Sequence, residues 1–161
     1  KTDVSFAWTP ECQSAFDRAK QLLSSAPVLA FFDPSRSAIV QCDASPTALG
    51  VVLSQVGVDG VERPVAYAHR ALTKTERLYA QVDREALAVV WGVKKFDKYL
   101  YGGLPFVIQT DHRPLLRILG EKVGLPPVIA ARLSRYAMTL RMYRYTIQYK
   151  KGQEHLNADA L

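Results

Sequence analysis

A single acidic residue between two apolar runs constrains the fold more than any other feature of the chain. Residues 38–40 are apolar and lead into Asp43, mostly small residues follow over 44–50, and a second apolar run covers 51–53. This pattern is typical of a strand, a tight turn and a second strand. Because a buried carboxylate is costly without a cationic partner, Asp43 is expected to meet a cation. We interpret that cation as a metal ion.

Composition is that of an ordinary globular domain. The 161 residues suit one domain with its own core, and 48% of them are apolar while 22% are charged. Cys12 and Cys42 are the only cysteines and form no CxxC pair, which disfavours a disulfide framework or structural zinc and favours a reducing, intracellular setting. No apolar run approaches the roughly 20 residues that span a bilayer, and no secretory leader is recognisable, so no membrane partner is expected.

Positive charge is concentrated in the second half of the chain. The net charge is +6, and residues 1–80 hold 8 basic and 8 acidic residues, whereas residues 81–161 hold 13 basic and 7 acidic ones. A one-sided basic balance indicates a polyanionic partner, with nucleic acid the first candidate. Solubility alone explains the charge equally well.

Hydrophobic periodicity and turn residues predict an α/β fold with five strands. The predicted strands cover residues 37–43, 50–56, 64–70, 106–111 and 144–149. An Asp59-Gly60 turn makes the first three strands an antiparallel meander. A long helix precedes the fourth strand, which implies a crossover and parallel pairing with an earlier strand.

Helices are predicted between and around these strands. They cover residues 9 to about 24, 73 to about 101, 113–119 and 128 to about 142, and a last helix begins near 157 and is cut off at 161. Thr9 is expected to cap the first helix, with Pro10 in its first turn. Cys12, Phe16, Ala19 and Leu23 recur at helical spacing, so the helix is expected to bury one face.

The second helix departs from regular periodicity at one position. It is expected to begin at a capping box formed by Thr73 and Glu76. Its apolar stripe runs from Leu78 to Leu100 in steps of three and four, except that Glu85 fills one stripe position. A carboxylate there points toward the core side of the helix.

Four acids are predicted to form one site. Asp43 and Asp111 end strands that we expect to lie side by side, Glu85 lies on the helix that packs on them, and Asp159 begins the last helix. Clustered carboxylates repel one another, and divalent cations remove that repulsion. Oxygen ligands without cysteine or paired histidine indicate Mg²⁺ or Mn²⁺, and two such ions can promote phosphodiester cleavage.

Each acid also has an interpretation without a metal. Asp43 could cap a turn through Ser45, Glu85 could pair with Arg84 or Lys94, Asp111 could pair with Arg113, and Asp159 could offset a helix dipole. The four acids in one predicted arrangement favour the metal site over the four separate explanations.

The order of these acids along the elements resembles ribonuclease H, and more narrowly the gypsy-type LTR retrotransposon reverse transcriptases. The motifs that carry the resemblance are Cys42-Asp43-Ala44-Ser45, Pro64-Val65-Ala66-Tyr67, Glu76 to Tyr79 followed by Glu85, Thr110-Asp111-His112, and Ala158-Asp159-Ala160-Leu161. In addition, Phe6-Ala7-Trp8-Thr9 and the following helix resemble the segment that joins the polymerase to the ribonuclease H.

The resemblance implies a ribonuclease H-like fold: a five-stranded mixed sheet, three antiparallel strands then two parallel, flanked by helices. It divides the chain into a connecting helix and linker over 1–35 and a ribonuclease H domain over 36–161, with the last helix truncated. It implies that Asp43 bridges two Mg²⁺ ions, for which Mn²⁺ may substitute. Asp159 would help hold the ion that activates water, and Glu85 and Asp111 the ion beside the leaving group.

The implied activity is hydrolysis of the RNA strand of an RNA/DNA hybrid, leaving a 3′-hydroxyl and a 5′-phosphate. The implied partners are that hybrid and the polymerase domain of the same polyprotein, in cytoplasmic virus-like particles. Contacts to the hybrid are expected from Ser45, Arg70, Lys94, Lys95, Lys98 and Arg113.

Two other functions compete with a nuclease. A non-catalytic connector, or a host-adopted binding module with this fold, has no need of four acids, and this chain keeps all four. Integrases and transposases share the fold but place a glutamate last, on a late helix. Here Glu85 is second and Asp159 is last, which favours the nuclease.

Overall fold

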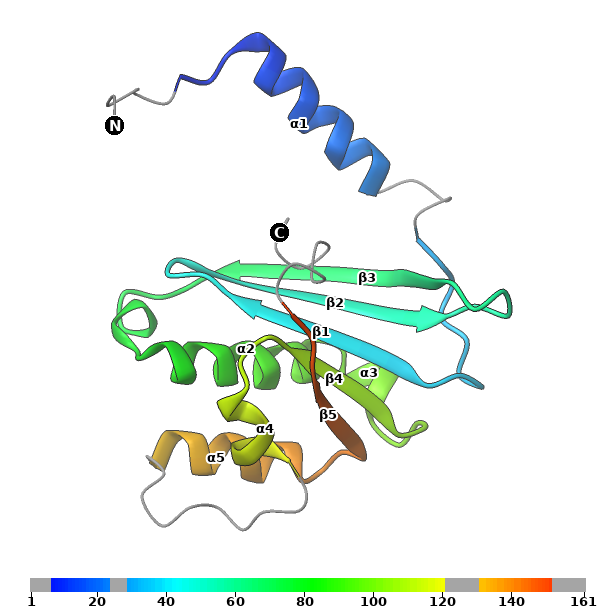
Figure 1. The fold of residues 1–161 in the computed structure, drawn as a ribbon, viewed down its shortest axis with the longest axis vertical. Coiled ribbons are helices and arrows are strands. Elements are labelled where there is room, and N and C mark those ends of the chain that lie inside the picture. The colour runs from blue at the N-terminus through cyan, green and yellow to red at the C-terminus, as the bar shows by residue number, and fades with distance from the viewer. Residues whose placement is uncertain (1–6, 24–28, 121–130, 152–161) are drawn as a thin grey trace.

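The computed structural model describes residues 7–23, 29–120 and 131–151 and contains one five-stranded mixed sheet. The strand order is β3-β2-β1-β4-β5 (Figure 1). The strands are β1 (Ala38–Ala44), β2 (Ala48–Val56), β3 (Glu62–Ala71), β4 (Phe106–Thr110) and β5 (Tyr145–Tyr149). β1, β2 and β3 pair antiparallel, and β4 pairs parallel with both β1 and β5, as the sequence predicts.

The predicted Asp-Gly turn closes the hairpin between β2 and β3. The Gly57 N–H donates to the carbonyl of Val61 at 2.8 Å, and Gly60 has a positive φ of 75°, a conformation that favours glycine. This turn fixes the antiparallel register of the two strands, apart from one irregularity at Leu53 and Ser54.

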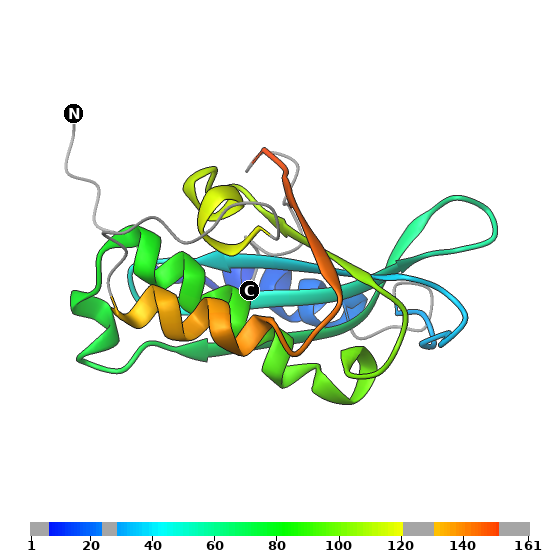
Figure 2. The same cartoon turned by 90° about the horizontal axis from the view of Figure 1, so that it is seen from below.

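Helices cover one face of the sheet and build the core against it. They are α2 (Gln81–Lys95), α3 (Asp97–Leu100), α4 (Pro114–Leu119) and α5 (Ala131–Leu140). Figures 1 and 2 show α2, α4 and α5 gathered on one side of the sheet, with α1 (Pro10–Leu23) on the other. α2 packs directly on β1 and β2, and buried Val40, Val51, Val89 and Val93 belong to this interface.

The single long helix predicted over 73–101 is wrong, because the chain divides there into three helical pieces. Thr73 and Glu76 make the reciprocal bonds of a capping box, at 2.8 and 3.2 Å, but they open only a 3₁₀ turn, η1 (Glu76–Leu78). Tyr79 is extended, and α2 starts afresh at Gln81. Leu78, predicted to face the core, is 86% exposed.

The first helix was predicted to bury an apolar face, and this prediction is wrong for the part of α1 whose side chains the structure describes. Thr9 accepts a bond from the Cys12 N–H at 3.3 Å, in keeping with the predicted cap. However, α1 extends away from the sheet in Figure 1, and Trp8, Phe16 and Leu22 are exposed. The amphipathic spacing therefore correctly predicted a helix, but this helix does not pack its apolar residues on the core of the sheet.

Within the described ranges, no helix is both long enough and apolar enough to cross a membrane.

The close approach of α2 to β2 at Gly92 generates a testable prediction. A Cβ on Gly92 would lie 2.7 and 2.8 Å from the two methyl carbons of fully buried Val51. We expect Gly92→Ala to lower the free energy of unfolding by about 1–2 kcal/mol, because overpacking outweighs the gain of roughly 1 kcal/mol in helix propensity. Urea unfolding measures the change.

The matched control is the double variant Gly92→Ala/Val51→Ala, in which the two methyl groups are gone. We expect it to lose less stability than the sum of the single variants. Additive losses would contradict the close packing of α2 on β2.

Candidate metal centre

Three of the four predicted acids converge in the structure. Asp43 near the end of β1, Glu85 on α2 and Asp111 directly after β4 each offer a carboxylate oxygen, and these oxygens lie within 4.8 Å of one another. The parallel pairing of β1 with β4 explains the approach of the two aspartates. Each of them lies two residues beyond the last paired position, which joins Gln41 to Gln109.

Glu85 reaches the same point from the helix that covers the sheet. It lies on the buried face of α2 and is 3% exposed, whereas Asp43 is half-buried and Asp111 is exposed. The deeply buried acid of the site is therefore Glu85, rather than Asp43, for which the sequence had suggested the greatest cost of burial. The prediction that the Glu85 side chain faces the core side of its helix is confirmed.

Burial and repulsion act together on Glu85. Its pKa is raised to about 8, first by burial and then by the negative charges of Asp43 and Asp111. A hydrogen bond from Gln81 and the charge of Arg84 oppose the rise without cancelling it. Burial also raises the pKa of the Cys42 thiol, and the negative charges of Glu85 and Asp43 raise it further. Cys42 is therefore an unreactive core residue.

The alternative ion pairs do not form between described residues. No Lys or Arg nitrogen there lies within 4.0 Å of a Glu85 or Asp111 carboxylate oxygen. Arg84 instead donates to the carbonyl of Tyr79 at 2.9 Å, and the Arg113 guanidinium lies over the ring of Tyr149.

Ser45 is engaged in the turn between β1 and β2. Its hydroxyl accepts the Ala48 N–H at 2.8 Å and the Thr47 N–H at 3.2 Å. These bonds hold the chain that leaves Asp43, so Ser45 helps to shape the site whether or not it contacts a nucleic acid.

The predicted basic contacts lie in three places. Arg70 on β3 makes a bidentate ion pair with Glu76, at 2.7 and 2.8 Å. Lys94 and Lys95 are exposed at the end of α2, roughly 15 Å along the helix from Glu85, and exposed Lys98 lies over the ring of Tyr99. Arg113 is the predicted base that lies beside the acids, two residues after Asp111.

Asp159, the fourth predicted ligand, lies outside the described residues, as does the helix expected to begin near 157. Two contributors were missed at the level of sequence. Gln81 stands one helical turn before Glu85, a spacing that could have revealed its bond to Glu85. Tyr149, which receives Arg113, had no such signal, because the contact joins two distant segments.

The three carboxylates fit a divalent metal ion. They form an all-oxygen donor set of the kind that Mg²⁺ and Mn²⁺ prefer. Glu85 is buried and its pKa is raised, and a bound cation would favour its ionised form. Asp43, Glu85 and Asp111 are thus the residues that could hold the ion.

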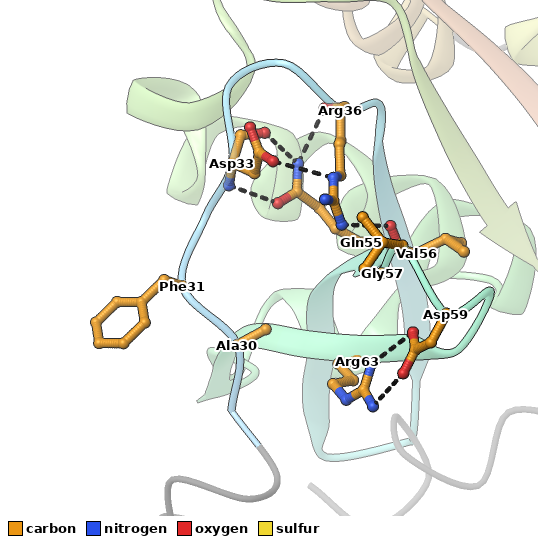
Figure 3. Close-up of a pocket in the computed structure, with 10 residues that line it drawn as sticks. Ala30, Phe31, Asp33, Arg36, Gln55, Val56, Gly57, Asp59 and Arg63 are labelled. Carbon is orange, nitrogen blue, oxygen red and sulfur yellow. Dashed lines mark hydrogen bonds and ion pairs between the residues drawn. The ribbon is translucent and has the colours of Figure 1, made fainter.

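A separate pocket lies at the opposite end of β1 and β2, beside the β2–β3 hairpin (Figure 3). Its volume is about 250 Å³, and Phe31, Val58, Arg36 and Arg63 are among its lining residues. Both arginines already have carboxylate partners, with Asp33 at 3.0 Å and Asp59 at 2.6 Å respectively. The pocket lies about 17 Å along β1 from the three acids, and its charges are already paired. We therefore assign it no role in the chemistry of the acids.

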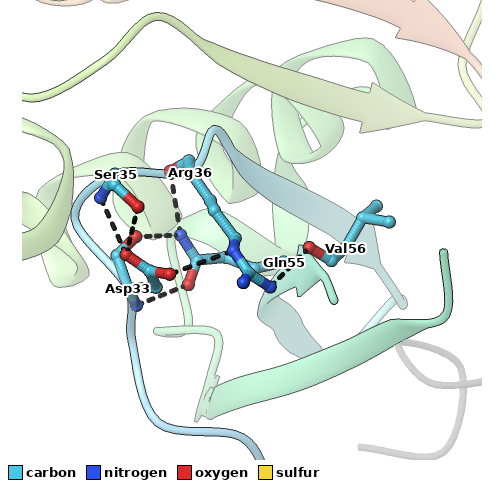
Figure 4. A network of polar contacts seen from close by, with 5 residues as sticks. All are labelled: Asp33, Ser35, Arg36, Gln55 and Val56. Atoms are coloured by element: carbon cyan, nitrogen blue, oxygen red, sulfur yellow. Dashed lines mark hydrogen bonds and ion pairs between the residues drawn. The ribbon is translucent and has the colours of Figure 1, made fainter. Parts of the chain in front are cut away.

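The network beside that pocket is structural (Figure 4). The buried Gln55 amide accepts the Asp33 N–H at 2.8 Å and donates to the carbonyls of Asp33 and Arg36 at 2.8 and 2.9 Å. These three bonds fasten the segment that leads into β1 and so fix where β1 begins.

The sheet order and acidic centre define a ribonuclease H-like domain, and comparison with known sequences identifies its family. The family described as "RNase H-like domain found in reverse transcriptase" matches residues 8–108. The chain belongs to this family.

Two curated relatives align with the whole chain. It is 38% identical over 161 residues to the retrovirus-related Pol polyprotein from transposon 412 of Drosophila melanogaster. It is 37% identical over 163 residues to the transposon Tf2-3 polyprotein of Schizosaccharomyces pombe. The chain spans 12% of the length of each polyprotein.

Solved structures share the fold at low sequence identity. A foamy viral protease-reverse transcriptase dRH in complex with double-stranded DNA aligns with a TM-score of 0.70 at 18% identity, covering 90% of this chain and 27% of that one. The foamy viral protease-reverse transcriptase in complex with an RNA/DNA hybrid gives 0.60 at 19%, covering 91% and 19%. RNase H1 from Halobacterium salinarum gives 0.57 at 16%, covering 78% and 93%.

The raised pKa of Glu85 predicts an unusual pH dependence for the metal-free chain. Between its ordinary value of 4.5 and about 8, the folded state keeps a proton that the unfolded chain has lost. The free energy of unfolding should therefore fall as pH rises through this window, by up to about 1.4 kcal/mol per pH unit. Urea unfolding in EDTA at several pH values between 5 and 8 measures this slope.

Glu85→Gln should flatten the slope, while Glu11→Gln on exposed α1 should leave it as in the unsubstituted chain. Equal slopes in the unsubstituted chain and the Glu85→Gln variant would show that Glu85 ionises normally in the fold.

Proposed function

We propose that this chain is a ribonuclease H, an endonuclease that hydrolyses the RNA strand of RNA/DNA hybrids during reverse transcription. The observation that carries the proposal is the convergence of Asp43, Glu85 and Asp111 from three separate elements, with no basic side chain paired to Glu85 or Asp111 among the described residues. A fold without a catalytic duty gains nothing from such repulsion.

In this proposal the acids hold two Mg²⁺ ions, for which Mn²⁺ substitutes. Asp43 would help to hold both ions, Glu85 and Asp111 the ion that stabilises the leaving oxygen, and Asp159 the ion that activates the water. Bound ions supply an activated water and stabilise the leaving oxygen. The fold orients that chemistry: the pairing of β1 with β4 fixes the two aspartates, and α2 brings Glu85 to them from its buried face.

The substrate is proposed from the family and from charge. The foamy viral enzyme of the same fold was solved with an RNA/DNA hybrid, and the basic excess of this chain lies in residues 81–161. Cleavage of the RNA strand requires recognition of the 2′-hydroxyl, which distinguishes RNA from DNA. Ser45, Arg70, Lys94, Lys95, Lys98 and Arg113 remain the proposed contacts.

The wider setting is proposed by analogy with the polyprotein relatives. We place residues 1–35 as the connection from the polymerase domain, and 36–161 as the ribonuclease H domain, acting in cytoplasmic virus-like particles. A non-catalytic connector with the same fold is the second candidate. The retained acidic centre favours the nuclease.

The direct test is cleavage of an RNA/DNA hybrid labelled on each strand, with Mg²⁺ or Mn²⁺. We expect RNA fragments with a 3′-hydroxyl and a 5′-phosphate and an intact DNA strand. Asp43→Asn should reduce the rate by about two to three orders of magnitude, because metal assistance contributes several kcal/mol. Without metal it should keep or raise the melting temperature, since it relieves repulsion.

Asp17→Asn, on exposed α1, removes an equal charge away from the site and should cut at the unsubstituted rate. A chain that binds the hybrid without cutting it would support the connector. An Asp43→Asn variant that cuts at full rate would remove Asp43 from the metal site.

A further inference from the structure

Arg113 stands beside the acidic centre in an orientation that an aromatic ring defines. It follows Asp111 by two residues and precedes α4. Its guanidinium carbon lies 4.5 Å from the centroid of the Tyr149 ring, at the end of β5. A guanidinium over an aromatic face is attracted to it, and the contact limits the rotamers of a long side chain.

The backbone on each side of this contact is held by one buried residue. Thr110, 1% exposed, pairs with Tyr149 in the β4–β5 register, and its carbonyl accepts the Lys150 N–H at 3.0 Å. Its hydroxyl accepts the His112 N–H at 3.1 Å. Since Thr110 immediately precedes Asp111, the ring, the arginine and the catalytic carboxylate share one rigid support.

Arg113 has no carboxylate partner among the described residues, whereas four arginines of the fold do. Arg36, Arg63, Arg70 and Arg132 each pair with a carboxylate. Arg113 is exposed and has no carboxylate oxygen within 4.0 Å among the described residues. Residues 112–119 and 131–151 contain no Asp or Glu, so α4, α5 and β5 add no negative charge near it.

We propose that Tyr149 is a positioning residue that holds Arg113 against a backbone phosphate of the bound hybrid, close to the bond that is cut. This inference rests on the proposed function and adds the residue pair that places the substrate. The planar guanidinium matches two phosphate oxygens, and the ring face fixes its plane before binding. An unpaired base beside three acids also favours a phosphate that approaches them.

The test measures KM, kcat and the salt dependence of hybrid binding in four single variants and one double variant. Arg113→Gln should raise KM about tenfold and reduce the slope of log K against log [salt] by about 0.7–0.9, with a much smaller change in kcat. Tyr149→Leu should reproduce most of this change. Tyr149→Phe keeps the ring and should restore near-normal KM.

The double variant Arg113→Gln/Tyr149→Leu should be no worse than Arg113→Gln, because the tyrosine acts through the arginine. Arg135→Gln, at an exposed position of α5, removes one charge elsewhere and controls for net charge. Equal KM values for Tyr149→Leu and Tyr149→Phe, or an unchanged KM for Arg113→Gln, would overturn the proposal. If Tyr149→Leu does not fold, Arg113→Gln still decides the phosphate contact.

Hybrids with one phosphate at a time replaced by methylphosphonate locate that contact. One replacement near the cleaved bond should weaken binding to the unsubstituted chain and have no further effect on Arg113→Gln. Binding is measured with Ca²⁺ in place of Mg²⁺, so this arm needs no cleavage. A chain that never cleaves the hybrid, but in which Arg113→Gln removes the effect of one methylphosphonate, would refute the nuclease and support the phosphate contact. Cleavage with no such dependence on Arg113 would refute the phosphate contact alone.

Discussion

Repulsion among the carboxylates of Asp43, Glu85 and Asp111 is the constraint that the rest of the structure must satisfy. Oxygen atoms of all three lie within 4.8 Å, and Glu85 is nearly excluded from water. Such a group is stable only if the surrounding fold holds it together and if a proton or a cation lowers its charge. The raised pKa of Glu85 is the response of the metal-free chain to that constraint.

The fold supplies the restraint from two directions. Parallel pairing of β1 with β4 fixes the distance between the two aspartates, and α2 packs so closely on β2 that Gly92 has no room for a side chain. Hydrogen bonds by Ser45, Gln55 and Thr110 hold the segments that enter or leave these strands. Stability built into the sheet and α2 therefore maintains a site that is itself destabilising, a pattern common in enzymes.

Sequence reasoning predicted the sheet and the three converging acids because both follow from local patterns. Period-two strands, an Asp-Gly turn and Glu85 within an apolar stripe are visible without a structure. The predictions were wrong where tertiary packing determines the local structure. The Thr73–Glu76 box is equally compatible with a 3₁₀ turn, and the extended Tyr79 that separates it from α2 carries no breaker residue.

The contact of Arg113 with Tyr149 was also beyond sequence reasoning, since the two residues meet only when β5 pairs with β4. Amphipathic spacing in α1 likewise predicts a helix but not the surface that it contacts.

The most direct test of the account is the number of protons released when a divalent ion binds. Calorimetric titration with Mg²⁺ or Mn²⁺ in buffers of different ionisation enthalpy gives this number at each pH. Because the pKa of Glu85 is about 8, binding at pH 7 should release about one proton, and the release should fall toward zero above about pH 9. The Glu85→Gln variant should release almost none. Binding without proton release at pH 7, or no binding at all, would contradict a metal centre built on mutually repelling carboxylates.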